Sequence, residues 1–161
     1  MPITNSREKF VHELADTYDA EHQFLEAMGK MHEKASDEKL KAMLELHMSE
    51  TQEQIERLEL VFSSIGKEPE RQHCSGAEGI IEEGSRAMEE AATDEIRDQF
   101  IVGGATKAEH YEMVSYADLI EGAEESGAPL HCMWKPIADF DRGEPLYPDG
   151  LLDLLRSGTE K

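Results

Sequence analysis

The chain has 161 residues, a length that fits one domain with a single sizeable core. Acidic residues outnumber basic ones 36 to 16, and the formal net charge of −20 excludes proteins that bind nucleic acids or anionic membrane surfaces. No window approaches the roughly 18 consecutive apolar residues of a membrane span, and the N-terminal segment lacks the apolar core of a signal peptide. We therefore expect a cytoplasmic protein with no membrane or nucleic-acid partner.

Two long helices are predicted in the first 65 residues. The first runs from Ser6 to Lys34, where apolar residues recur at steps of three and four. Ser36 is the predicted N-cap of the second, which runs to about Ile65 and ends at Gly66, because glycine is favoured just after a helix.

Two further helices are predicted after a polar linker over residues 67–76. A shorter amphipathic helix covers residues 77–92. Thr93 is then followed by two acidic residues, which is typical of an N-cap and first turn, and a third long helix is predicted from there to about Glu125.

The chain changes character after Gly127. Four prolines exclude a long helix between residues 128 and 149, and only residues 151–158 have the pattern of a short terminal helix. We therefore divide the chain into a helical bundle over residues 1–127 and an atypical C-terminal segment over residues 128–161. This segment is expected to pack on the bundle or on a partner subunit.

Polar residues interrupt the apolar faces of the three long helices. They are Glu21 in the first helix, His47 and Glu50 in the second, and Glu109 and Glu112 in the third. None of the other positions that we place on these faces holds lysine or arginine. Because an isolated buried carboxylate costs several kcal/mol, these acids need protons, an arginine from outside the faces such as Arg57, or a metal ion.

The spacing of the first two helices brings two of these acids together. Glu21 lies about 14 residues before the turn near residue 35, and Glu50 lies about 14 residues after it. At a rise of about 1.5 Å per residue, both lie roughly 21 Å from the turn. In an antiparallel hairpin they are therefore expected to face each other.

The residue types indicate which metal such a site would take. Carboxylates with imidazole and without thiolate suit iron or manganese. Helical di-metal proteins combine single glutamates with Glu-x-x-His pairs, and this chain offers His47-x-x-Glu50 and Glu109-x-x-Glu112. The alternative is that these acids lie at the edges of the apolar faces, in contact with water.

Four segments resemble the YciE/YciF family of ferritin-like bacterial stress proteins, and the resemblance covers residues 8–122. The segments are "ELADTYDAEHQFLEAMGKM" (13–31), "HMSETQEQIERLELVF" (47–62), "GIIEEG" (79–84) and "KAEHYEMVSYADL" (107–119). The resemblance implies a rubrerythrin-like four-helix bundle, often dimeric, with a candidate di-metal centre. It does not imply a particular reaction, because the biochemical role of that family is poorly defined.

The C-terminal segment departs from this family. Its members continue into a fourth long helix with an acidic inner face, whereas this chain carries the proline-rich residues 128–161 there. The ligands of that helix are therefore missing or replaced. The C-terminal segment, the helix over 77–92 or a partner subunit could complete the bundle, and the site could hold two metal ions, one or none.

The sequence thus predicts an all-α, ferritin-like antiparallel four-helix bundle with a proline-rich segment in place of a full fourth helix. We expect a homodimer that binds iron or manganese through the five residues above. Its reaction with oxygen or peroxide would protect the cell during stress, although the sequence does not establish catalytic turnover. The alternative is a non-catalytic structural or interaction protein with a degenerate site. A third reading is an acidic adaptor that docks through Trp134 and Phe140.

Overall fold

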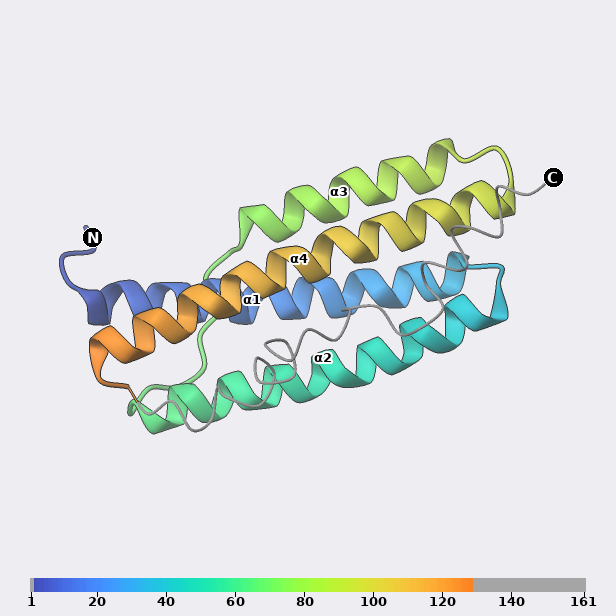
Figure 1. The fold of residues 1–161 in the computed structure, drawn as a ribbon. Helices are drawn as coiled ribbons and strands as arrows, with labels where there is room; N and C mark the ends of the chain where they lie inside the picture. Colours follow the sequence, from blue (N-terminus) through green and yellow to red (C-terminus); the bar gives the residue numbers. More distant parts are fainter. Residues whose placement is uncertain (1, 129–161) are drawn as a thin grey trace.

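The computed structural model describes residues 2–128, which form four helices joined by short connections (Figure 1). They are α1 (Ser6–Lys34), α2 (Glu38–Ser64), α3 (Ser75–Glu90) and α4 (Asp94–Ser126). The predicted all-α four-helix bundle is confirmed. None of these helices is both long enough and apolar enough to span a membrane. The predicted helix over residues 151–158 and nearly all of the C-terminal segment lie outside the described residues.

The helix ends follow from side-chain caps, with one correction. Thr93 caps α4 as predicted, because its hydroxyl accepts a hydrogen bond from the backbone N–H of Ile96 at 3.2 Å. The cap of α2 is Asp37 and not Ser36. Ser36 lies one residue too early, and its hydroxyl and backbone N–H both donate to the carboxylate of Asp98 on α4. This contact ties the α1–α2 turn to the start of α4.

A buried aspartate fixes the linker between α2 and α3. The carboxylate of Asp19 accepts hydrogen bonds from Nε of Arg71 at 2.7 Å, Nε2 of Gln23 at 2.6 Å and the backbone N–H of Cys74 at 2.8 Å. Burial alone would raise the pKa of Asp19, but these bonds more than offset it and the pKa is lowered. Cys74 is the N-cap of α3, which therefore begins two residues earlier than predicted.

The central helix of the bundle is α1. It packs on α2, on α4 and on α3, while α3 also packs on α4. Figure 1 shows α3 and α2 on opposite sides of the pair formed by α1 and α4. The helix predicted over residues 77–92 therefore completes the four-helix bundle by packing on α4 and α1, on the side away from α2. Because α1 is covered on several sides, its buried surface extends well beyond the predicted apolar face, to Thr17, Ala20, Phe24, Ala27 and Met31.

Candidate metal centre

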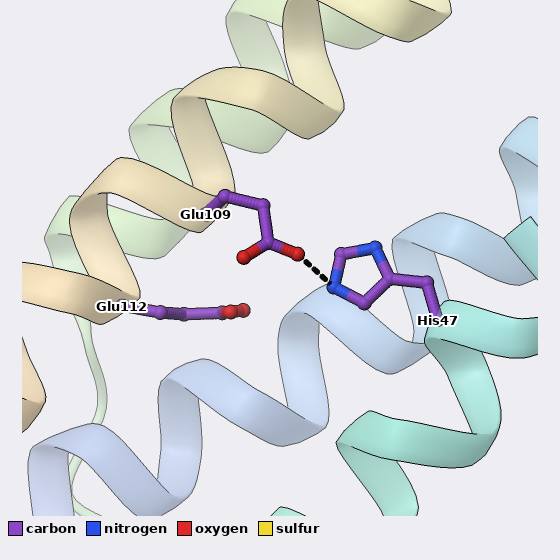
Figure 2. Close-up of side chains that lie close together, drawn as sticks. All are labelled: His47, Glu109 and Glu112. Carbon is purple, nitrogen blue, oxygen red and sulfur yellow. Dashed lines mark ion pairs between the residues drawn. The ribbon is translucent and has the colours of Figure 1, made fainter. Parts of the chain in front are cut away.

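Three potential metal ligands from α2 and α4 meet in the middle of the bundle. Nitrogen or oxygen atoms of His47, Glu109 and Glu112 all lie within 4.8 Å of one another (Figure 2). Nε2 of His47 forms an ion pair with Oε1 of Glu109. Residues three apart on a helix are neighbours on its surface, so Glu109 and Glu112 point to the same region from consecutive turns of α4.

A fourth carboxyl group reaches this region from α1. Glu21 is 0% exposed, and its Oε1 accepts a hydrogen bond from the hydroxyl of Tyr116 at 2.7 Å. The other oxygen of Glu21 has no hydrogen-bond partner among the described residues, and the same is true of Oε1 of Glu112, a side chain that is 5% exposed. Buried polar atoms without partners are rare and costly, so these oxygens call for a proton or a cation.

The pKa values of these groups are shifted in the direction expected for crowded, buried acids. Burial raises the pKa of Glu21 to about 7, and the charge of Glu109 acts in the same direction. Burial, followed by the charges of Glu21 and Glu109, raises the pKa of Glu112 well above its usual range. Burial would lower the pKa of His47, but the hydrogen bond and charge of Glu109 outweigh it and the pKa is raised. Without a metal, the cluster therefore retains protons near neutral pH.

Arg57 does not supply the missing positive charge. Its guanidinium pairs with Glu53 on the same helix at 2.9 Å. Among the described residues, the imidazole of His47 pairs with Glu109, and it is cationic when it is protonated. Of the three sources of positive charge that the sequence left open, protons and a metal ion remain.

Glu50 lies outside the cluster, and the expectation that it faces Glu21 from inside the bundle is wrong. Its side chain is exposed, whereas the next residue, Thr51, is 0% exposed. The buried face of α2 is centred on residues such as Leu44 and Ile55, which pack toward α1, so the run that contains Glu50 forms the edge of that face. Glu50 still contributes to the raised pKa of His47 through its charge.

Several buried polar groups of α2 and α4 were not singled out from the sequence. Tyr116 was assigned to the apolar face, yet its hydroxyl is the hydrogen-bond donor to Glu21. Oγ1 of Thr51 and Oε1 of Gln54 are buried without partners among the described residues. The position of Tyr116, one turn after Glu112, is the feature of the sequence that could have indicated its role.

The donor set fits a hard or borderline metal ion. The cluster offers one imidazole and two carboxyl groups from two helices, without a thiolate, and this combination suits iron or manganese. Two buried carboxyl oxygens have no other partner. The chemistry of the residues present therefore fits such an ion.

Comparisons with known proteins agree with the resemblance found in the sequence motifs. The model of a family described as a domain of unknown function (DUF892) matches residues 5–132. Protein YciF of Escherichia coli is 38% identical over 128 residues, which is 79% of this chain and 77% of that protein.

Two solved structures share the fold. The crystal structure of the E. coli stress protein YciF matches with a TM-score of 0.83 and 31% identity, covering 99% of this chain and 100% of the other. YcfI of Rhodopseudomonas palustris, for which a structural role has been suggested, matches with a TM-score of 0.82 and 34% identity, covering 87% and 90%.

Proposed function

We propose that this chain, which belongs to the DUF892 family of domains of unknown function, binds an iron or manganese ion through His47, Glu109 and Glu112. Glu21 is the fourth donor. One observation carries the proposal. Glu21 and Glu112 each have a buried carboxyl oxygen without a hydrogen-bond partner among the described residues. Glu112 also belongs to the cluster of potential ligands. A bound cation would remove the cost of burying these charges.

The chemistry that such a metal supplies is one-electron redox reaction with oxygen or peroxide. Carboxylate donors favour the oxidised, more highly charged ion. Tyr116 holds Glu21 in one orientation through its hydroxyl. E. coli YciF is described as a stress protein, and by analogy we propose that this chain handles metal or oxidants during stress.

Metal content tests this proposal directly. We would incubate protein purified anaerobically with Fe(II) and, separately, with Mn(II), remove unbound metal and measure metal per chain. At least one ion per chain is expected for the wild type. In the double variant Glu109→Ala/Glu112→Ala, metal content should fall to background because two of the ligands are gone.

The matched control is Glu121→Ala/Glu124→Ala, which removes two exposed acids at the same spacing from the same helix. This variant should bind as much metal as the wild type. If the wild type binds none, or if both double variants retain it equally, the proposed site is wrong.

The alternative is a structural protein whose site is degenerate, and two contacts favour it. The ion pair between His47 and Glu109 and the hydrogen bond from Tyr116 to Glu21 satisfy part of the cluster without a metal. A ligand that binds only the folded state raises the melting temperature. A metal-binding protein should therefore melt at a higher temperature with Mn(II), whereas the structural alternative predicts an unchanged melting temperature.

A further inference from the structure

Methionines gather in one part of the core. Five of the six methionines that the structure describes belong to one apolar cluster or pack against it, whereas the other two apolar clusters of the described chain contain none. The five are Met28 and Met31 on α1, Met43 and Met48 on α2, and Met88 on α3. We call these five side chains the methionine cluster.

The methionine cluster lies where all four helices meet. The apolar residues around it include Ala35, at the turn between α1 and α2, and Ile101 of α4. The packing is close, because a Cβ atom on Gly104 of α4 would lie only 3.4 Å from Cε of Met31. An added atom on a buried methionine therefore has little room unless the helices move apart.

The five thioethers differ in their exposure to solvent. Met28, Met31 and Met88 are buried, with exposed fractions of 4%, 7% and 5%. Met43 and Met48 are half-buried and pack against the buried side chains of the cluster. A molecule in solution therefore reaches the two methionines of α2 before it reaches the other three.

A thioether reacts with a hydroperoxide by accepting one oxygen atom. With hydrogen peroxide, the O–O bond breaks and an S–O bond forms, while the proton of the transferred oxygen passes to the departing hydroxide to give water. The sulfur loses two electrons and the peroxide gains them. The product, methionine sulfoxide, is polar and is therefore unsuited to an apolar contact.

We propose that Met43 and Met48 form an oxidation site, at which a hydroperoxide converts two thioethers to sulfoxides and thereby opens the methionine cluster. The S=O groups need hydrogen-bond donors, which an apolar cluster lacks, so they turn toward water and uncover the three buried methionines. Reduction of the sulfoxides by methionine sulfoxide reductases reverses the change. The inference goes beyond the proposed function and does not rest on it, because no metal takes part.

The oxidation site lies beside the candidate metal centre. Met43 precedes His47 by one turn of α2, and Met48 directly follows it. Met28 and Met31 line the same small space as His47. Opening the methionine cluster therefore changes the surroundings of His47, whether or not an ion is bound.

The first test follows the oxidation of each methionine by peptide mass spectrometry. The full chain is treated with hydrogen peroxide in the presence of a chelator, so that bound iron does not contribute. Met43 and Met48 should be oxidised first, and the three buried methionines should follow after a lag, several-fold more slowly at the start. Oxidation of all five without a lag would overturn the inference. So would buried methionines that stay reduced after the other two have fully reacted.

Leucine variants test whether the buried methionines depend on the two exposed ones. Met43→Leu/Met48→Leu conserves volume but cannot be oxidised at these positions, so the buried methionines should stay reduced several-fold longer than in the wild type. The matched control is Met113→Leu, because Met113 is half-buried on α4 and lies outside the methionine cluster. This variant should be oxidised like the wild type. Equal protection in both variants, or protection in neither, would contradict the inference.

Hydrogen exchange tests whether oxidation opens the bundle. Once Met43 and Met48 have reacted, backbone amides around Met31 should exchange several-fold faster, whereas those around Leu14 and Leu119, in another cluster, should not change. Met43→Gln/Met48→Gln introduces polar side chains without oxidation and should give the same pattern, which keeps the inference testable if the leucine variant does not fold. Unchanged exchange around Met31 in the oxidised protein would overturn the proposed opening.

Discussion

Glu21 and Glu112 are buried carboxyl groups, and the charges of other acids add to the effect of burial on their pKa values. The protons that they keep in the metal-free protein have a consequence for stability. A folded state that binds more protons than the unfolded state becomes less stable as the pH rises. Their raised pKa values therefore link the chemistry of the site to a measurable pH dependence.

Replacing Glu21 tests this link. The pKa of Glu21 rises on folding from 4.5 to about 7. Below about pH 4.5 the group is protonated in both the folded and the unfolded state, so its titration does not change the free energy of unfolding. As the pH rises to 7 and above, the ionisation of Glu21 lowers the free energy of unfolding. A shift of this size corresponds to about 3 kcal/mol. We expect metal-free wild type to lose more stability between pH 5 and pH 8 than Glu21→Gln does, as measured by urea unfolding.

Glu26→Gln is the matched control, because Glu26 lies on the same helix, is exposed and pairs with Lys30. Its pH dependence should resemble that of the wild type. If Glu21→Gln also follows the wild-type curve, Glu21 is ionised throughout this range and does not hold a proton.

Thr51 provides a separate prediction for a buried hydroxyl group. It is 0% exposed, and its Oγ1 has no described partner. Valine has the same shape without the hydroxyl, so Thr51→Val should raise the free energy of unfolding by about 1 kcal/mol. The control is Thr106→Val, because the hydroxyl of Thr106 donates a hydrogen bond to the carbonyl of Val102. Loss of that bond means that no increase in the free energy of unfolding is expected for this variant. Denaturant unfolding of both variants would decide, and equal effects would contradict the prediction.

At the scale of helices and linkers, Asp19 has the largest expected effect. Asp19→Ala removes the acceptor of three hydrogen bonds and leaves the backbone N–H of Cys74 without it. The cost should be about 2–4 kcal/mol, with faster hydrogen exchange in α3. Arg71→Gln should cost less than about 1 kcal/mol, because the arginine side chain is half exposed. Unchanged exchange in α3 of Asp19→Ala would show that the linker does not depend on this contact.

Sequence patterns predicted the helices well, because their determinants are local. Thr93 caps the start of α4 through a contact within the first turn. Gly66 follows the end of α2 and adopts a positive φ of 72°, which favours glycine. The positions of Glu21 and Glu112 also followed from the helical period, because each lies inside a wide buried face.

The remaining features depend on how distant helices meet. The exposure of Glu50 is set by the rotation of α2 against α1, which a single-helix pattern does not specify within one residue. The partners of Asp19 lie up to 55 residues away along the chain. The hydrogen bond from Tyr116 to Glu21 spans 95 residues. Contacts of this kind become visible only when the bundle is assembled.

At the scale of the whole molecule, the proposed metal centre lies where three helices converge. Glu21 comes from α1, His47 from α2, and Glu109 and Glu112 from α4. The closest packing joins α1 to α2 and α1 to α4, so a metal ion would add a direct link between α2 and α4. The expected homodimer stays a prediction, and sedimentation equilibrium of the full chain is the way to check it.

The most direct measurement is diffraction from crystals of the full chain grown with Mn(II), recorded at the manganese absorption edge. The proposed site predicts an anomalous peak enclosed by Nε2 of His47 and the carboxylates of Glu109 and Glu112, with Glu21 beside it. A peak confined to exposed acids such as Glu121 or Glu124, or no peak at all, would contradict a metal centre inside the bundle.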